Sequence, residues 1–249
     1  MGQAKTLEWL AFNTTSNPER TMAFIKESLG LYRELGNLTG ITVCLNSLSQ
    51  ITMRSGDFKS PLPWVEEALS ISRQLGDQTN EAYILSLSAA LAYWQGNYQQ
   101  AKSYYHEVLL LTEKTGDNFL KLWIHVHIGY AFLHQGNIQQ ARALFVDSIH
   151  NTHTVGLAGI LVFAVEGMAS LYVDQNQFKR ATQLFAWTDA MREELGDHRP
   201  LVEQRSVERD LAIIHSKLDD ADFAKFSEEG RLMTKEQVIT LALDTAEEM

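Results

Sequence analysis

RELGN, at residues 33–37, returns at steps of 40 residues as RQLGD (73–77), EKTGD (113–117), HTVGL (153–157) and EELGD (193–197). A second glycine series has the same period and lies between these segments, in SGDF (55–58), QGNY (95–98), QGNI (135–138) and, with Asn176 in place of glycine, QNQF (175–178). Repetition at a fixed period of this length is the signature of a repeat protein, in which each unit stacks on its neighbours. The sequence therefore predicts a repeat array rather than a bundle of unrelated helices.

Each node of the two series is expected to end a helix. The residue after a helix often adopts the left-handed conformation, which glycine enters without a Cβ clash and asparagine tolerates next best. The segments between nodes, about 16 to 20 residues long, carry apolar residues at helical spacing, such as Val126 and Leu133. The next helix then opens with a capping residue, either Asn17, Ser60, or an Asp or Asn just after a series glycine. The pattern predicts antiparallel helix pairs.

The two series divide the chain into repeats. We expect a single all-α domain over residues 1–249, made of a leading helix pair, four full repeats, and a closing helix with a C-terminal cap, at residues 1–35, 37–75, 77–115, 117–155, 157–195 and 197–249. The last segment departs from the period, as expected of a cap that shields the final apolar face. Within it, Thr234 and Gln237 have the spacing of a capping box, so a short last helix is expected there.

Composition narrows the functional classes. The formal net charge of −10 repels phosphate backbones and anionic membranes, so direct nucleic-acid binding and membrane binding are not expected. The chain lacks the run of about 18 apolar residues that spans a bilayer, and its start lacks a signal-peptide cleavage pattern. The single cysteine, Cys44, has apolar neighbours and is expected to be a buried thiol in a reducing compartment. These features predict a cytoplasmic protein.

Catalytic and metal-binding signatures are absent from the sequence. It contains no HExxH, GxSxG, GxGxxG or GxxxxGK[ST] motif, so we expect neither an enzyme nor a cofactor. The histidines with close spacing do not favour a metal site, because His125 and His127 point to different sides of a helix, and His150 and His153 have no carboxylate at ligand spacing. No metal site is predicted.

Small and large residues recur in register with the glycines. The first helices carry a small residue at Ser49, Ala89, Gly129 and Ala169, and the second helices carry one at Ala101, Ala141 and Ala181. A large residue follows in each second helix, at Val65, Tyr105, Phe145 and Phe185. This pattern resembles the tetratricopeptide motif in its 40-residue form, with departures at Pro61, Thr52 and Ala92. The resemblance implies a right-handed α-α superhelix that binds a protein or peptide.

The C-terminal end carries a second resemblance. The run from RPLVEQRSVERDLAIIHSKL to MTKEQVITLAL (199–243) is similar to the end of the helical-repeat sensor region in bacterial ATPase regulators of the STAND and LuxR types. That resemblance implies the sensor or interaction part of a signalling or transcriptional regulator.

By the tetratricopeptide resemblance, first helices line a concave groove. The residues expected to bind there are Asn46, Gln50, Arg54, Tyr83, Tyr93, Trp94, Trp123, Tyr130, His134, Phe163 and Glu166. Aromatic side chains are enriched where binding energy concentrates, and the polar members suit a peptide backbone or a carboxylate. The same aromatics could instead fill the core. Two further functions stay open, namely a small-ligand receptor that uses this groove and a homo-oligomer formed through the face of Trp9 and Phe12.

Overall fold

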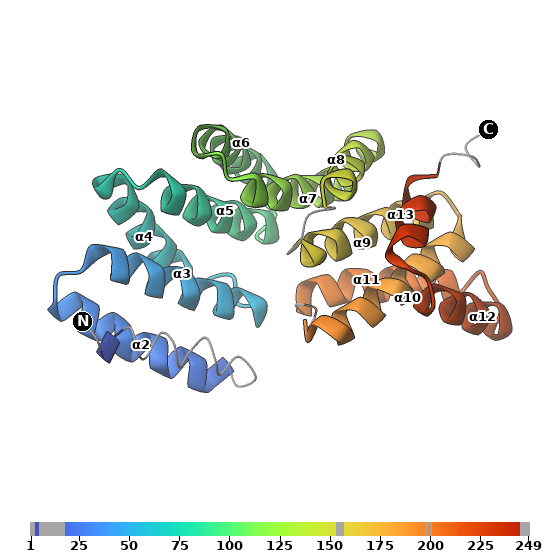
Figure 1. Cartoon of the computed structure of the whole chain (residues 1–249), viewed down its shortest axis with the longest axis horizontal. Helices are drawn as coiled ribbons and strands as arrows, with labels where there is room; N and C mark the ends of the chain where they lie inside the picture. Colours follow the sequence, from blue (N-terminus) through green and yellow to red (C-terminus); the bar gives the residue numbers. More distant parts are fainter. Residues whose placement is uncertain (1–2, 5–17, 153–156, 198, 200, 245–249) are drawn as a thin grey trace. The chain divides into compact units, whose positions relative to one another are not determined.

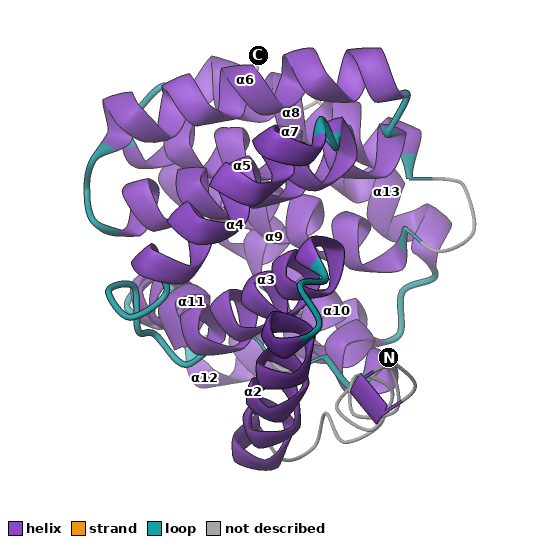
Figure 2. Cartoon of the chain, turned by 90° about the vertical axis from the view of Figure 1, so that its left-hand side faces the viewer, coloured by secondary structure: helices purple, strands orange, loops and turns teal. Residues whose placement is uncertain are grey.

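The computed structural model describes residues 3–4, 18–152, 157–197, 199 and 201–244. The predicted cap Asn17, the node Gly156 and the face of Trp9 and Phe12 lie outside these residues. The chain divides into two compact units, residues 1–120 and 121–249, and each is described by itself. All regular structure of the described residues is α-helical (Figures 1 and 2), which confirms the all-α fold class. None of the described helices has the length and apolar character that crossing a membrane requires.

The first unit is a row of helices. Those described are α2 (Pro18–Glu34), α3 (Leu38–Arg54), α4 (Leu62–Leu75), α5 (Gln78–Trp94) and α6 (Tyr98–Thr115). Each helix packs against the next one along the chain, and α3 also contacts α5, the first helix of the following repeat. The core of this unit gathers around the buried residues Cys44, Leu45, Leu48 and Ala68. Cys44 is therefore the buried thiol that the sequence predicts.

The second unit holds the last repeats and the cap. Its helices are α7 (Asn118–His134), which begins just before the unit boundary, α8 (Ile138–Asn151), α9 (Ala158–Asp174), α10 (Phe178–Leu195), α11 (Leu201–His215), α12 (Asp220–Arg231) and α13 (Lys235–Leu243). The helix α9 is buried along its length from Ile160 to Val173. Such complete burial follows from its neighbours, because α8, α10, α11 and α13 all contact it.

The described nodes of the glycine series all have the predicted left-handed backbone. Positive φ values occur at Gly36, Gly56, Gly76, Gly96, Gly116, Gly136 and Gly196. Asn176, at φ 61°, is the one other residue of the described part with a positive φ. At such a node the chain closes the helix with backbone hydrogen bonds, as where the N–H of Gln177 donates to the carbonyl oxygen of Tyr172 at 2.8 Å. The predicted helix ends are thus confirmed.

The predicted helix starts are only partly confirmed. The side chains of Asn37 and Asp77 each accept a hydrogen bond from the N–H three residues on. Contrary to the prediction, the side chains of Asn97 and Asn137 accept no capping hydrogen bond at the starts of α6 and α8, and Ser60 does not cap α4. The carboxylate of Asp57 instead accepts the hydrogen bonds of this turn, from the N–H groups of Lys59 and Ser60 at 2.9 and 3.0 Å. The hydroxyl of Ser60 also donates a hydrogen bond to this carboxylate. That bond contributes most to lowering the pKa of Asp57, and the two backbone N–H groups lower it further.

Close helix packing explains the small residues of the motif. A Cβ atom at Gly129 of α7 would lie 2.6 Å from the ring of Phe145, and one at Gly167 of α9 would lie 2.4 Å from the same ring. Phe145 of α8 is fully buried. Its ring therefore occupies space that side chains on both neighbouring first helices would otherwise need.

The last three helices, which we call the cap, pack against α9 and α10. Thr234 and Gln237 make the expected capping box at the start of α13. The hydroxyl of Tyr172 in α9 donates to the carbonyl oxygen of Ala242 at 2.8 Å, which fastens α13 to the last repeat. The helix α12 lies close against α10, where a Cβ at Gly230 would come within 2.2 Å of the carbonyl oxygen of Gln183.

Candidate functional site

In the first unit, the predicted groove positions on α3 and the neighbouring Val43 form one partly exposed face. Val43, Gln50 and Arg54 are exposed, while Asn46 is half-buried between them. The side-chain amide of Gln50 donates to the side-chain oxygen of Asn46 at 3.1 Å. This face therefore presents apolar surface beside amide and guanidinium groups, and the groove positions of α5 lie next to it because the two helices are in contact.

The predicted aromatic residues of α5 belong to a larger group, which we call the aromatic cluster: Phe58, Tyr93, Trp94 and Tyr98. The rings of Phe58 and Trp94 are stacked with their centroids 5.8 Å apart. Tyr93 meets Trp94 edge-on at 4.8 Å and Tyr98 at 5.6 Å. Trp94 is half-buried and Tyr98 is exposed, whereas Tyr93, which contacts both, is only 7% exposed. The cluster places half-buried Phe58 and Trp94 and exposed Tyr98 around Tyr93 at the end of α5.

Phe58 and Tyr98 were not among the predicted site residues. Each follows a series glycine by two positions, at Gly56 and Gly96, so the 40-residue period does contain the signal. The side-chain amide of Gln95 donates to the carbonyl oxygen of Phe58 at 2.8 Å and holds the turn against α5.

Tyr83 lies near the start of α5, whereas the aromatic cluster lies at its end. It is half-buried, and its pKa is raised mainly by burial and further by Asp117, with which it shares a hydrogen bond. The phenol thus stays neutral and can donate or accept a hydrogen bond. The α3/α5 face, as we call it from here, comprises Val43, Asn46, Gln50, Arg54, Tyr83 and the aromatic cluster.

In the second unit, the predicted groove positions on α9 are buried. Phe163 is 7% exposed and Glu166 is 2% exposed, so the prediction that they line an open groove is wrong. Trp123 meets Phe163 edge-on at 5.0 Å, and the hydroxyl of Tyr130 donates to the carbonyl oxygen of Phe163 at 2.9 Å. Burial, followed by the negative charges of Glu166 and Glu203, raises the pKa of Tyr130 well above its usual range.

Glu166 is buried because it is the centre of an internal ion-pair network. It accepts a hydrogen bond of 2.8 Å from Arg192 of α10 and is also paired with Arg199, which precedes α11. Arg199 in turn contacts the carboxylate of Asp189 at 2.6 Å, and the Arg192 guanidinium lies 4.4 Å from the centre of the Phe163 ring. These contacts satisfy the buried charges and join α9 to α10 and to the start of α11. Glu166 therefore holds the cap in place.

The remaining predicted residue, His134, lies at the far end of α7. It is exposed, and the charged groups that act on it are Arg209, Asp210 and Asp174. Desolvation, followed by the charge of Arg209, lowers the pKa of His134, which favours the neutral ring. Asp210 is buried and accepts a hydrogen bond of 2.6 Å from Ser170, so a second polar contact joins α11 to α9.

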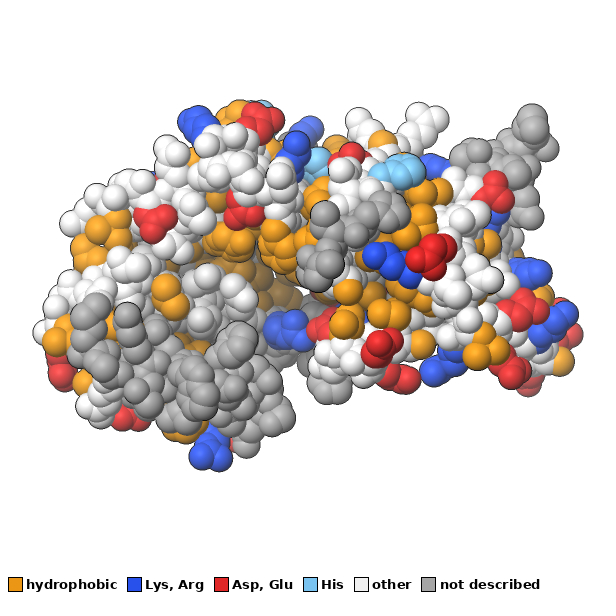
Figure 3. All heavy atoms as spheres, in the orientation of Figure 1, with side chains coloured by type: hydrophobic (Ala, Val, Ile, Leu, Met, Phe, Trp, Pro, Cys, Tyr) orange, Lys and Arg blue, Asp and Glu red, His pale blue; other side chains and the backbone are white. Residues whose placement is uncertain are grey.

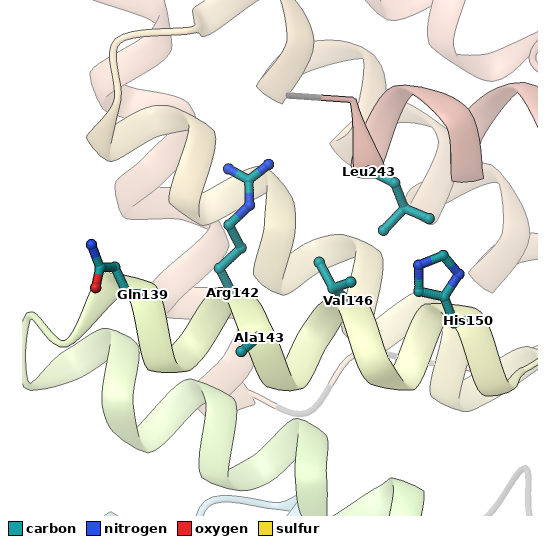
Figure 4. A pocket seen from close by; sticks show the side chains of 6 residues that line it. All are labelled: Gln139, Arg142, Ala143, Val146, His150 and Leu243. Carbon is teal, nitrogen blue, oxygen red and sulfur yellow. The ribbon is translucent and has the colours of Figure 1, made fainter. Parts of the chain in front are cut away.

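A pocket that sequence reasoning missed lies between α8 and the end of α13. Its volume is about 340 Å³, and Figure 4 shows the side chains that line it: Gln139, Arg142, Ala143, Val146, His150 and Leu243. Five of them come from one face of α8, and Leu243 approaches from the cap. The 40-residue period could not indicate this pocket, because the cap departs from the period.

Charged side chains elsewhere on this unit are arranged in mixed pairs. On the face that Figure 3 shows, basic and acidic side chains of residues 121–249 are interspersed. Arg231, for example, lies 3.4 Å from Glu193. His125 lies 2.9 Å from Asp147, and nowhere among the described residues do three His, Cys, Asp or Glu side chains come together as metal ligands would.

Comparison with known proteins supports the repeat assignment. The pattern of the tetratricopeptide repeat family matches residues 80–149. No curated protein sequence matches the chain. Among solved structures, BtubC from P. vanneervenii is similar over 89% of this chain and 90% of its own, with a TM-score of 0.60 and 18% identity.

A second solved structure is a Signal Transduction ATPase with Numerous Domains (STAND) from Pyrococcus horikoshii that carries a tetratricopeptide repeat sensor. The similarity covers 91% of this chain but 38% of that protein, with a TM-score of 0.58 and 14% identity. At such identities the likeness is one of fold. Residues 80–149 therefore match tetratricopeptide repeats, and the left-handed nodes at 40-residue steps continue a helical repeat on both sides of them.

Proposed function

We propose that this chain is a protein- or peptide-binding scaffold whose contact surface is the α3/α5 face of the first unit. Tetratricopeptide repeats generally mediate protein interactions, so a binding role is the expected one for such a fold. The observation that carries the proposal is the exposure of this face. Arg54 and Gln50 remain exposed on α3 while Trp94 and Tyr98 present aromatic surface beside them.

The chemistry of the face suits an extended peptide segment. Aromatic side chains lose little conformational entropy on binding and are enriched among residues that dominate interface energies. An apolar side chain of the partner would pack on Trp94 and Phe58. The amides of Asn46 and Gln50 can bond to its backbone, and Arg54 can pair with a carboxylate. Arg54 and Trp94 occupy equivalent positions, 40 residues apart, at the ends of neighbouring first helices, so one segment can contact both.

We further propose that the chain is the sensor or interaction part of a bacterial signalling or transcriptional regulator and that it acts in the cytoplasm. The support is the shared fold with the Pyrococcus protein, whose repeats are described as a sensor, together with the C-terminal sequence resemblance. The single buried thiol, Cys44, fits a reducing compartment.

The binding proposal can be tested with a selected peptide. A random peptide library is displayed and panned on the full chain, and the strongest binder is synthesised as the probe for calorimetry. Replacement of Trp94 by alanine should weaken its binding by about 30-fold, and Arg54→Ala by about tenfold, as for central anchors of an interface. The circular dichroism of each variant should match that of the original chain.

Two exposed residues on α6 provide matched controls. Leu110 is 47% exposed and Lys102 is exposed, and both lie on the second-helix layer of the first unit. Leu110→Ala and Lys102→Ala should leave the affinity unchanged. If the α6 variants weaken binding while the Trp94 and Arg54 variants do not, the α3/α5 face is not the contact surface.

A further inference from the structure

The rings of the aromatic cluster are fixed by contacts between a turn and α5. Phe58 lies in the turn between α3 and α4, and the side-chain amide of Gln95 donates to its carbonyl oxygen at 2.8 Å. The ring of Phe58 stacks on that of Trp94 with an angle of 26° between the two planes. Tyr93 contacts both Trp94 and Tyr98 edge-on. The rings are therefore in position before a ligand arrives, which lowers the entropic cost of binding.

The electrostatic surroundings of the aromatic cluster favour an uncharged ligand. None of its four members is charged, and the two residues that flank Phe58 in the sequence, Asp57 and Lys59, have opposite charges that act on each other. The one acidic residue of α5, Glu81, lies in its first turn, at the opposite end of the helix from Trp94, and is paired with an arginine of α4 at 2.8 Å. A ligand of either sign would therefore lose hydration at the rings without a matching charge among them.

The polar groups of the cluster suit a ligand that has many hydrogen-bond acceptors and few donors. The indole N–H of Trp94 can only donate a hydrogen bond, and the hydroxyl of Tyr98 can donate one as well. The backbone acceptor beside them, the carbonyl oxygen of Phe58, is already bonded to Gln95. An α-helix uses its carbonyl groups internally, and a β-strand brings as many N–H donors as acceptors. A proline-rich segment instead presents carbonyl oxygens and has no N–H group at its prolines.

We propose that the aromatic cluster binds a proline-rich segment of a partner protein in the polyproline II conformation. This proposal rests on the binding role proposed above for the α3/α5 face and names the class of segment that the face takes. Proline rings pack on Phe58, Trp94 and Tyr98, and a carbonyl group between them accepts a hydrogen bond from the indole N–H. Aromatic surfaces recognise such segments well because the polyproline II helix is already formed in the free peptide, so little entropy is lost on binding.

Two mirror-image peptides test this class by calorimetry on the full chain: acetylated and amidated octaproline made of either L-proline or D-proline. At about 3.1 Å per residue, such a peptide extends over about 25 Å, which is enough to cover the cluster. The two peptides have the same composition and apolar area but form helices of opposite hand. L-octaproline should bind with a Kd of roughly 0.1 to 1 mM, as expected for few anchors, and D-octaproline should bind at least about tenfold more weakly.

Three substitutions locate the binding site. Trp94→Ala should weaken the binding of L-octaproline at least about tenfold. Trp94→Phe should weaken it by about threefold to tenfold, because phenylalanine keeps a ring but lacks the N–H donor. Phe119→Ala is the matched control, since Phe119 is an exposed aromatic residue of α7 outside the cluster, and it should have no effect. In NMR spectra, the indole N–H signal that is missing from the Trp94 variants should shift when L-octaproline is added to the original chain.

Several outcomes would overturn the proposal. Equal binding of the two octaprolines would do so, as would no binding of either up to about 10 mM, roughly ten times the upper end of the expected range. Unchanged affinity of both Trp94 variants for L-octaproline would also overturn it. If octaproline does not bind while the library-selected peptide binds and depends on Trp94, the face takes another class of segment and its binding role stands. If the selected peptide is insensitive to Trp94 and Arg54 as well, the binding role itself fails.

Discussion

Replacement of Glu166 by glutamine should destabilise the second unit by about 2 to 4 kcal/mol. Breaking a buried ion pair by removing one partner typically costs about 3 to 5 kcal/mol, because the remaining charge stays buried without compensation. Here the side chains of Arg192 and Arg199 are 5% and 9% exposed, and both are paired with Glu166. Glutamine keeps one acceptor oxygen, and each arginine keeps another carboxylate partner, so we expect a loss below the upper end of that range.

Urea unfolding measures this loss. The NMR signal of the indole N–H of Trp187, which is 3% exposed on α10, reports on the second unit, and far-UV circular dichroism reports on the whole chain. The matched control is Glu193→Gln in the same unit, because Glu193 lies 3.4 Å from Arg231 but its side chain is 68% exposed. An exposed pair contributes little, so this control should lose at most about 0.5 kcal/mol.

A double-mutant cycle of Glu166→Gln with Arg199→Met measures the interaction free energy between these two residues, apart from their contacts with the rest of the protein. The two substitutions together should cost less than the sum of their separate costs by about 1 kcal/mol or more, since residues that share a network are coupled. If Glu166→Gln costs no more than the exposed control, the buried network does not hold the cap. If instead it lowers the affinity for the selected peptide at unchanged stability, Glu166 is a recognition residue and our correction of the sequence prediction is refuted.

Two further predictions concern the second unit. Gly167→Ala should destabilise it by about 1 to 3 kcal/mol despite the better helix propensity of alanine, because the new Cβ would meet the ring of Phe145. The control is Gly159→Ala in the same helix, which has open space around it and should be neutral or stabilising by up to about 1 kcal/mol. Similar urea midpoints for the two variants would contradict this packing. Burial lowers the pKa of His127 to about 4, so the unfolded chain binds the proton first and stability should fall as the pH drops from about 6.5 to 4. Because part of the side chain remains accessible, we expect His127→Gln to remove about 1 to 2 kcal/mol of that fall, and an unchanged difference between unfolding at pH 7 and pH 4.5 would disprove the role of this histidine.

The parts of the fold that depend on local backbone chemistry could be predicted from the sequence. A left-handed helix end needs glycine or asparagine whatever lies around it, so the two series located helix ends at every described node, including Asn176. The capping box of Thr234 and Gln237 was predictable for the same reason, since its hydrogen bonds join residues three apart. Three predicted caps failed: Asp57 competes with Ser60 for the same turn, and Asn97 and Asn137 stand before α6 and α8 without a side-chain capping hydrogen bond.

The candidate sites were less predictable because they depend on contacts between distant segments. The groove positions that the period named on α3, such as Gln50 and Arg54, are exposed, and their binding role stays a prediction. On α9 the same register named Phe163 and Glu166, yet the residues that bury them come from the aperiodic end of the chain and from the connection before α11.

The sequence by itself determined the helical repeat, its period of 40 residues and the residues that end its helices, since each of these follows from hydrogen bonds and steric limits within a few residues. Only the tertiary structure decided which first-helix positions remain accessible, how Phe58 and Tyr98 complete the aromatic cluster, and where α13 meets α8 to form a pocket. These features depend on which surfaces are covered by side chains from elsewhere in the chain, and burial of this kind has no signal in the local sequence.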